Sequence, residues 1–494
     1  MLGWKIGDWD ADYKIDLPIL TEDEEEVVLA VEEMFKEASK YEDVSSEEKA
    51  EAIIRQLLQD YADEEGIYIE QDQFEYLTRV SLLHIYGFSL IDPLLKDDNI
   101  EEITVIGVNK PIYVYLRGEG WKKTNGMFTD INYLIDVINK MSRTLGRRIT
   151  YQSPRINAIL PDGSRLHASI PPVSNGEITI RKFREKPFTV FDLINYHTIS
   201  PDALAVLWLL MQSDISMIIA GNTASGKTTS LNALFSFVPF NERILITEET
   251  PEINIPHPHK INLVSNEDLN ITIASLVADS LRMRPDRVIV GEVRTAEELS
   301  ALIDTILSGQ ARGSYATFHA QSSYDVLKRM RSLGVLDIDL QSIDLIYIQR
   351  RMLRYDVKTH KTQEIRRVIE IVEVDKKQTM KVNPLVTYDY DKDDWIVNWR
   401  SSDLIERVRK SLGLSKQDIE HEIERREMFL TKHAKEHAKR GLSFEESVSL
   451  IQSFAYGGND KSGEKINRGR KDKGDKRRTT RRTRNRTNRM NRST

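Results

Sequence analysis

The chain of 494 residues contains no cysteine, which excludes disulfide bonds, thiolate metal sites and a cysteine nucleophile. It also lacks a long apolar run. The longest one, Ala203–Met211, is followed closely by Ser213 and Asp214 and falls well short of the ~20 residues that span a bilayer. The first ten residues have neither an apolar core nor a small-residue cleavage site, so they do not resemble a signal peptide. We therefore expect a cytoplasmic protein whose contact with a membrane is peripheral or made through a partner.

Charge is abundant but unevenly distributed. Residues 461–494 hold fifteen Lys or Arg against three Asp or Glu, so this segment carries +12 and leaves −19 on residues 1–460, for a total of −7. Because it has almost no apolar residues, we expect 457–494 to be a disordered tail. Three interpretations of it stay open. It is a solvated tail, or it binds anionic lipid at about 1 kcal/mol per basic residue, or it contacts nucleic acid, which its lack of aromatic side chains disfavours.

Periodicity divides the rest of the chain into regions. From 201 to 400, helical patterns alternate with short apolar strands, which indicates an α/β domain with a largely parallel sheet. The flanking regions are an acidic helical start, an α+β domain, a linker and a set of C-terminal helices, expected at 1–69, 70–186, 187–200 and 401–456.

The most specific motif is Gly221–Thr228, which has glycine, lysine and threonine at every position that a P-loop fixes. An apolar stretch precedes it and a helical pattern follows it, as this motif requires. In such a loop, backbone N–H groups and a helix N-terminus surround the phosphates of ATP. Lys227 then reaches the β- and γ-phosphates, and the Thr228 hydroxyl coordinates Mg²⁺. The expected nucleotide-binding residues are Gly221, Asn222, Thr223, Ala224, Ser225, Gly226, Lys227, Thr228 and Thr229.

A nucleotide hydrolase also needs acidic groups near the γ-phosphate, at the carboxyl ends of strands beside the P-loop. Arg287–Gly291 leads into Glu292, the candidate for the Walker B acid. Another expected strand leads into Glu248, Glu249 and Glu252, and their spacing alone does not identify the catalytic one.

Basic residues give weaker signals. His319 follows a further expected strand, but a lone histidine is more often structural. Four arginines of the α+β domain either reach the triphosphate or lie on the surface, and spacing does not decide between these: Arg147, Arg148, Arg155 and Arg165.

Together these motifs resemble the secretion ATPase superfamily of type II and type IV secretion, type IV pili and archaella. The matching segments are the P-loop, an acidic box, a Walker B segment and a His box, at Gly221–Thr229, Ile246–Glu252, Arg282–Arg294 and Ala316–Ala320. Leu160–Leu166 and Thr179–Phe183 are similar to the N-terminal domain of the archaeal branch, within which the archaellum or pilus motor ATPase is most similar. The resemblance covers roughly residues 45–455.

The resemblance implies a RecA-like P-loop ATPase domain and an α+β N-terminal domain, with helical extensions at both ends and ATP between the two domains. It implies that Glu252 orients the attacking water, that Glu292 is the Walker B acid and a ligand of Mg²⁺, that His319 senses the γ-phosphate, and that Arg165 contacts phosphate beside Lys227. The implied assembly is a homo-hexamer that acts on a polytopic membrane platform protein and drives filament assembly, rotation or related secretion.

Two departures from the family pattern stand out. Glu248-Glu249 replaces the usual Glu-Asp of the acidic box, and Ala311-Arg312 stands where many members have Gly-His. Two other functions stay open. A nucleic-acid translocase of RecA-like fold is disfavoured by the charge of −19 on residues 1–460. A scaffold that binds nucleotide without hydrolysing it is disfavoured because the P-loop and its acidic residues are intact.

Overall fold

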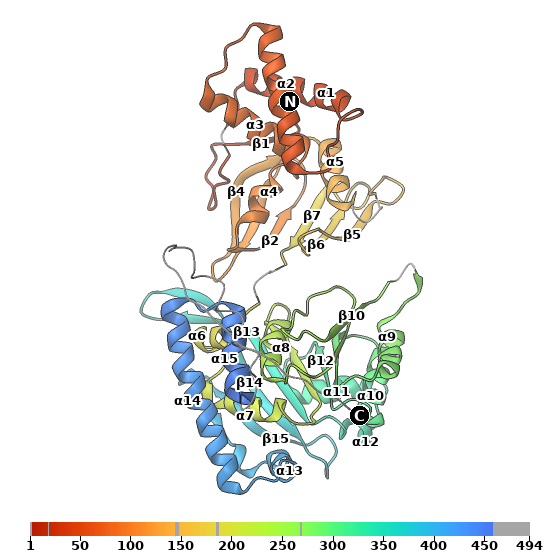
Figure 1. Cartoon of the computed structure of the whole chain (residues 1–494), viewed down its shortest axis with the longest axis vertical. Helices are drawn as coiled ribbons and strands as arrows, with labels where there is room; N and C mark the ends of the chain where they lie inside the picture. The colour runs from red at the N-terminus through yellow and green to blue at the C-terminus, as the bar shows by residue number, and fades with distance from the viewer. Residues whose placement is uncertain (1, 18, 144–147, 184–186, 267–268, 458–494) are drawn as a thin grey trace, which may run out of the picture.

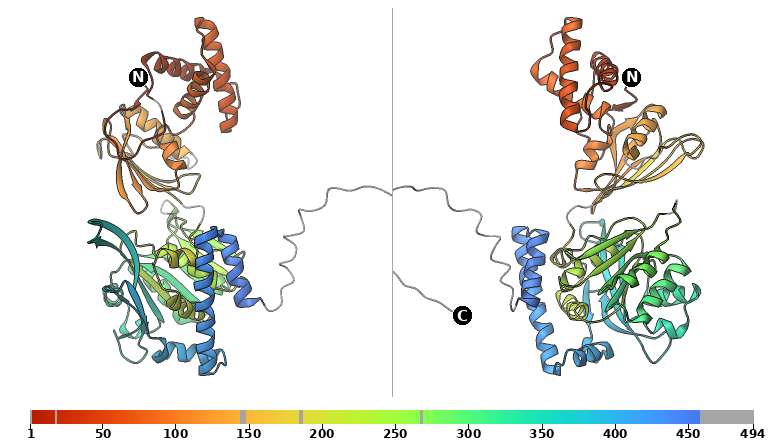
Figure 2. Two further views of the ribbon diagram at one scale, coloured as in Figure 1. Left: turned by 90° about the vertical axis from the view of Figure 1, so that its left-hand side faces the viewer. Right: turned by 45° about the vertical axis from the view of Figure 1, so that its right-hand side comes forward.

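The computed structural model describes residues 2–17, 19–143, 148–183, 187–266 and 269–457 (Figure 1). It contains two β-sheets, each covered by its own helices, and we call the two parts the N-terminal body (2–183) and the C-terminal body (187–457). Both views of Figure 2 place the N-terminal sheet directly above the C-terminal body. Apart from Gly457, the predicted disordered tail lies outside the described residues, as does Arg147.

The N-terminal body has a seven-stranded antiparallel sheet in the order β1-β4-β3-β2-β7-β6-β5. Its strands are Trp4–Ile6 (β1), Ile100–Val105 (β2), Pro111–Leu116 (β3), Gly120–Phe128 (β4), Arg155–Ile159 (β5), Arg165–Ser169 (β6) and Glu177–Arg181 (β7). Its helices are Glu22–Ala38 (α1), Glu47–Glu65 (α2), Gln71–Ile85 (α3), Ile91–Lys96 (α4) and Ile131–Ser142 (α5). Strands and helices alternate here around one sheet, which makes this part of the chain an α+β domain.

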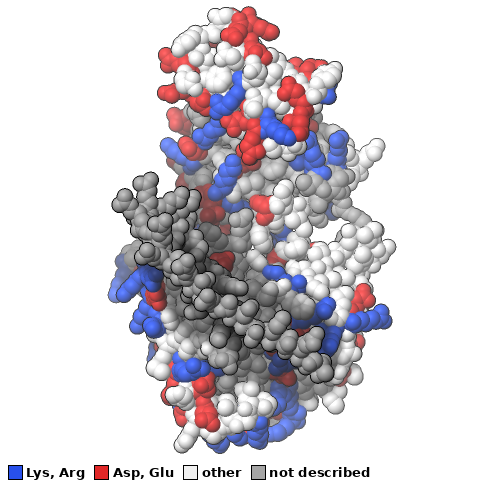
Figure 3. Space-filling model, in the orientation of Figure 1, with Lys and Arg blue, Asp and Glu red and all other residues white. Residues whose placement is uncertain are grey.

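The first 69 residues are not a purely helical region. Trp4 pairs with Phe128 across β1 and β4, so the beginning of the chain forms an edge strand of the sheet. Val28 of α1 and Ile54 of α2 are fully buried in the same cluster as Ile103 of β2. Burial of apolar side chains therefore joins the acidic helices and the sheet into one core. The outer surface of these helices stays acidic, as the top of Figure 3 shows.

The C-terminal body has a nine-stranded sheet in the order β10-β9-β11-β12-β8-β13-β14-β15-β16. The first six strands in this order are parallel to one another, which confirms the expected α/β fold. The last three run antiparallel, because short turns rather than crossover helices connect β13 to β16. The strands are Met217–Gly221 (β8), Ile244–Glu248 (β9), Lys260–Val264 (β10), Arg287–Val293 (β11), Gly313–Phe318 (β12), Leu345–Asp356 (β13), Lys361–Val374 (β14), Val382–Asp389 (β15) and Asp394–Val397 (β16).

Helices cover both faces of the parallel part of this sheet. They are Val190–Asn195 (α6), Pro201–Met211 (α7), Lys227–Leu234 (α8), Ile273–Ser280 (α9), Ala296–Ser308 (α10), Ser323–Ser332 (α11), Asp337–Leu340 (α12), Asp403–Ser411 (α13), Lys416–Arg440 (α14) and Phe444–Tyr456 (α15). Short 3-10 turns follow α8 and α9 and precede α13, at Phe235–Phe237, Leu281–Met283 and Trp399–Ser401. The helices expected after residue 400 are therefore present as α13, α14 and α15.

The segment expected as a linker, 187–200, is largely part of the C-terminal core. Its helix α6 buries Val190, Phe191 and Leu193 in the same cluster as α7. The Asn195 side chain also donates a hydrogen bond to the carbonyl of Ala434 in α14, at 3.1 Å. An amphipathic helix this short is stable only against a packed surface, which explains why it docks instead of remaining free.

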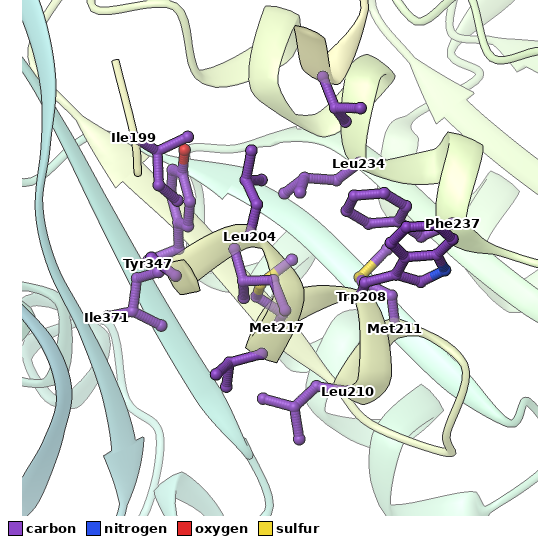
Figure 4. Packing of buried hydrophobic residues seen from close by; sticks show 14 of the residues in the cluster. Ile199, Leu204, Trp208, Leu210, Met211, Met217, Leu234, Phe237, Tyr347 and Ile371 are labelled. Carbon is purple, nitrogen blue, oxygen red and sulfur yellow. The ribbon is translucent and has the colours of Figure 1, made fainter. Parts of the chain in front are cut away.

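The longest apolar run of the chain forms α7, and it is buried on all sides. Every residue of Ala203–Met211 is at most 1% exposed, because the sheet lies on one side of the helix and α14 on another. Trp208 stacks on Phe237 with ring centroids 4.7 Å apart, and Figure 4 shows the two rings next to each other at the right of the cluster. Among the described helices, none is long and apolar enough to cross a membrane.

Truncation of Trp208 tests how far the C-terminal body depends on this cluster. We expect Trp208→Ala to lower the free energy of unfolding by about 3–5 kcal/mol, because the surrounding rings cannot close the cavity that it leaves. Urea denaturation followed by circular dichroism measures this. The control is Trp121→Ala, at a tryptophan that is 50% exposed, and its cost should stay below about 1 kcal/mol. An equal loss of unfolding free energy in the two variants would contradict the dependence of the C-terminal body on Trp208.

Candidate nucleotide-binding and active site

The P-loop leaves the carboxyl end of β8, which lies between β12 and β13 inside the sheet, and it enters α8 at Lys227. Two of its glycines are required by the neighbouring strand β13. A Cβ on Gly221 would lie 2.0 Å from the carbonyl oxygen of Gln349. Gly226 has φ +93°, and a Cβ there would lie 2.8 Å from the Gln349 side chain. The loop therefore has a turn and a concave shape that a side chain at either position would obstruct.

Two residues of β13, Gln349 and Arg351, brace the loop, and the sequence motif does not reveal them. The buried Gln349 donates from Nε2 to the Ser225 carbonyl at 2.7 Å and accepts from the Ser230 hydroxyl at 2.6 Å. The Asn222 side chain exchanges two hydrogen bonds with the backbone of Arg351, at 2.9 and 3.0 Å. These contacts fix the loop before any ligand arrives, which lowers the conformational cost of binding.

The two polar residues that follow Gly226 point back over the loop. The Lys227 ammonium donates to the carbonyls of Gly221 and Asn222, at 3.3 and 3.2 Å. Burial lowers the pKa of Lys227, although the charges of Glu292 and Glu252 oppose this shift. The Thr228 hydroxyl donates to Glu252 Oε2 at 3.2 Å. A cation, a hydroxyl and a helix N-terminus thus meet at one point, which is the donor set that a phosphate requires.

The structure separates the three glutamates that spacing could not distinguish. Glu248 is 2% exposed and accepts hydrogen bonds from the backbone N–H groups of Glu252 and Ile253, at 2.8 and 2.9 Å. Glu249 is half exposed and pairs with Arg294 at 2.5 Å. Glu252 faces the P-loop, because its carboxylate contacts Thr228. Of the three, Glu252 is therefore the glutamate that contacts the P-loop, and Glu248 supports the loop that carries it.

Glu292 and His319 lie together at the ends of the neighbouring strands β11 and β12. Glu292 Oε1 is 2.8 Å from His319 Nε2, and Glu292 Oε2 accepts two hydrogen bonds from Arg294, at 2.6 and 2.9 Å. Burial and then the Lys227 charge lower the pKa of His319, although the Glu292 charge opposes this shift, so the neutral form of the ring is favoured. Arg294 bridges Glu249 and Glu292 and was not identified as a site residue from the sequence.

Arg165 is the arginine of the N-terminal body that reaches this site. It extends from β6, and one guanidinium nitrogen lies 2.9 Å from Glu252 Oε1 and 3.4 Å from the carbonyl of Thr250. Its Nε is buried and has no hydrogen-bond partner among the described residues, so the guanidinium keeps a donor for a ligand. Arg148 and Arg155 are exposed, and neither contacts the P-loop or the acidic groups.

The unusual environment of Glu248 has a measurable consequence. Burial raises the pKa of Glu248 to about 7 from its ordinary value of 4.5. Between these two values the folded state keeps a proton that the unfolded state releases, so this group makes the free energy of unfolding fall as the pH rises. We expect Glu248→Gln, which cannot ionise, to gain stability relative to the wild type between pH 5 and pH 8. Urea denaturation at these pH values measures the difference, with Glu249→Gln as the exposed control. Parallel pH profiles of the wild type and Glu248→Gln would contradict the prediction.

Comparisons with known proteins identify the family of this chain. Residues 89–420 match the sequence family described as "Type II/IV secretion system protein". Two uncharacterized proteins of Methanocaldococcus jannaschii are similar: one is 38% identical over 48% of this chain and 37% of its own length, the other 30% identical over 73% and 66%. The chain thus spans between about a third and two thirds of the length of these two relatives. The solved Legionella pneumophila ATPase DotB is 18% identical, with a TM-score of 0.43 over 73% of this chain and 94% of DotB. The match to more than half of the chain, together with a P-loop in a RecA-like parallel sheet, shows that this chain belongs to the type II/IV secretion ATPase superfamily.

Proposed function

We propose that this chain is a Mg²⁺-dependent ATPase that powers a filament-assembly or secretion machine. The observation that carries the proposal is the convergence of Lys227, Thr228, Glu252, Glu292 and His319 at the carboxyl ends of β8, β9, β11 and β12. Four separate segments place a cation, a hydroxyl, two carboxylates and a neutral imidazole around one P-loop. In a parallel sheet, ligands bind at the carboxyl ends of the strands, which is where these groups lie. Family membership also supports an ATPase.

The residues fit ATP and Mg²⁺ by their own chemistry. A Cβ at Gly226 would obstruct the turn at which α8 begins, where the N–H groups of a helix N-terminus bind phosphate oxygens, and Lys227 adds its charge. Mg²⁺ in such sites is held by one or two protein groups together with phosphate oxygens, and Thr228 and Glu292 supply these groups. When bound, the ion neutralises charge that develops on the phosphates.

In this proposal each side chain has one task. Glu252 orients the attacking water and accepts its proton, because it is the carboxylate of the acidic box that contacts the P-loop. The Nε2–H of neutral His319 donates to Glu292 in this structure, and it would be free to donate toward the γ-phosphate once Glu292 turns to Mg²⁺. In this structure the Arg165 guanidinium lies 2.9 Å from the Glu252 carboxylate. A triphosphate would offer the guanidinium a more highly charged partner.

Exchange of Arg165 from Glu252 to a phosphate would free the catalytic carboxylate and attach the N-terminal body to the nucleotide. Hydrolysis and phosphate release would reverse this exchange, so that the two bodies close and open once per cycle. We propose that six copies form a ring in the cytoplasm, against the inner face of the membrane. There the ring would push on a polytopic membrane platform protein of a pilus-like or archaellum-like filament.

Two substitutions separate binding from hydrolysis. We expect Glu252→Gln to lower kcat for ATP hydrolysis by at least ~100-fold while ATP still binds, because the group that orients water is lost. Lys227→Ala should abolish both binding and turnover, since the phosphates lose the ammonium group of the P-loop. Phosphate release and binding of a fluorescent ATP analogue measure the two effects, with Glu249→Gln as the matched control.

Other outcomes of this experiment would point elsewhere. Stimulation of phosphate release by DNA or RNA would favour a nucleic-acid translocase over a filament motor. Binding of ATP without turnover by the wild type would contradict the hydrolase assignment. Undiminished turnover by Glu252→Gln would contradict the role of this glutamate.

The basic tail gives a separate test of membrane association. We propose that residues 461–494 hold the protein at anionic lipid, because several basic residues at about 1 kcal/mol each suffice for stable adhesion. The full chain should co-sediment with vesicles that contain phosphatidylserine, and a variant that ends at residue 460 should not. Neutral phosphatidylcholine vesicles and 0.5 M salt are the controls, since both remove the electrostatic attraction. Equal sedimentation of both proteins would assign lipid binding elsewhere or exclude it.

A further inference from the structure

The N-terminal sheet contacts the C-terminal body at a second place beside the P-loop, apart from Arg165. There Glu101 of β2 and Tyr115 of β3 meet Glu364 and Arg366 of β14. The left view of Figure 2 shows the ends of β13 and β14 rising toward the N-terminal sheet. None of these residues belongs to a recognised P-loop, acidic-box, Walker B or His-box segment.

Arg366 holds the middle of the P-loop. Its Nε donates a hydrogen bond to the carbonyl of Ala224 at 2.9 Å. Ala224 has φ +58°, a backbone conformation that residues with a side chain rarely adopt and that a nearby contact must stabilise. The Arg366 side chain also passes 3.9 Å from where a Cβ on Gly226 would lie. Arg366 therefore lies against the two positions of the loop with positive φ.

The other end of Arg366 connects to the N-terminal sheet through Glu364. A guanidinium nitrogen lies 3.1 Å from Glu364 Oε1 and 3.6 Å from Glu101 Oε2. The Tyr115 hydroxyl donates to Glu364 Oε2 at 2.7 Å. Burial, followed by the hydrogen bond to Glu364, raises the pKa of Tyr115 to about 12, so this hydroxyl keeps its proton. Glu364 is only 18% exposed, which limits screening of its contacts by solvent and salt.

A second contact joins Glu364 to the same loop. Arg351, whose backbone pairs with the Asn222 side chain, places a guanidinium nitrogen 3.7 Å from Glu364 Oε2. Arg351 and Arg366 face each other in the register of β13 and β14. The Glu364 carboxylate therefore contacts three groups: Arg351, whose backbone binds Asn222; Arg366, which binds the Ala224 carbonyl; and the Tyr115 hydroxyl of β3.

Peptide geometry gives this cluster a function. The carbonyl of Ala224 and the N–H of Ser225 belong to one planar peptide unit, so neither can turn without the other. If the N–H of Ser225 turns toward a phosphate, the oxygen that Arg366 holds must move as well. That movement reaches β3 through Glu364, because the three side chains are in direct contact.

We propose that Arg366, Glu364 and Tyr115 form an interdomain relay that reports nucleotide binding in the P-loop to the N-terminal sheet. In this relay Arg366 is a positioning residue for the loop, and Tyr115 is the receiving group. The inference rests on the proposed function, since it presupposes that the P-loop binds ATP. The relay is separate from Arg165, which contacts the loop of Glu252.

The test compares nucleotide affinity with the response of β3. Hydrogen exchange of the full chain, with and without ATP, measures protection of Pro111–Leu116, and steady-state kinetics measure KM and kcat. We expect ATP to slow exchange in this strand of the wild type. Tyr115→Phe should lose that difference while KM stays within about twofold, because the loop itself is intact. Arg366→Gln should raise KM about fivefold or more with a smaller change in kcat, since the loop loses a hydrogen bond from a charged donor.

The control is Tyr113→Phe, on the same strand and the same face as Tyr115. The Tyr113 hydroxyl has no hydrogen-bond partner within the part of the chain that the structure describes, so this variant should behave as the wild type. A double-mutant cycle of Tyr115→Phe with Glu364→Gln should show that the two exchange effects are not additive, as expected for one shared contact.

Two results would overturn the relay. One is an ATP-dependent change in β3 that persists in Tyr115→Phe. The other is an additive cycle. A wild type that binds no ATP would instead reject the proposed function, so the two failures are distinguishable.

Discussion

The close approach of β13 to the backbone at the end of β8 is the constraint on which the rest of this structure depends. Gly221 and Gly226 lie against Gln349, and neither position has room for a side chain. This packing forces the chain to turn after β8 and to begin α8 with its N–H groups directed into the turn. Because β8 lies inside the sheet between β12 and β13, the same turn opens at the edge where the acidic groups of β9 and β11 also end.

At that edge, burial and charge give similar residues different chemistry. Three glutamates lie within five positions of one another, yet each has a different environment. Glu248 is buried and keeps its proton near neutral pH, Glu249 is neutralised by Arg294, and Glu252 faces Thr228. A buried carboxyl that binds backbone N–H groups stabilises a loop, whereas a carboxylate beside a hydroxyl and a phosphate cradle can act on a ligand. Glu249 stands where the acidic box of the family usually has Asp, and its partner is Arg294. This departure therefore changes an ion pair and leaves Glu252 in place.

The N-terminal body is connected to this edge through charged side chains. Arg165 contacts the loop of Glu252. Tyr115 and Glu101 contact Glu364 and Arg366 of β14. Contacts of this kind are weaker than a packed apolar interface and depend on the charge of what lies between the bodies. In the proposed function, a highly charged ligand such as a triphosphate would therefore compete directly with the contacts that position the two bodies. The opposite holds inside each body, where apolar clusters fix helices and sheet as single units.

The sequence alone determined the features that local pattern specifies. Alternating helices and apolar strands predicted the parallel sheet, and the spacing of Gly221, Gly226, Lys227 and Thr228 predicted the P-loop, because glycine and helix periodicity act over a few residues. The tertiary structure decided which Glu faces the loop, which of the described arginines reaches it, and that Gln349, Arg294 and Arg366 hold the site. It also placed Trp4 in the N-terminal sheet and Phe191 of the expected linker in the C-terminal core. Such contacts join residues far apart in the chain, as Tyr115 and Glu364 are at 249 positions, and no local periodicity encodes them.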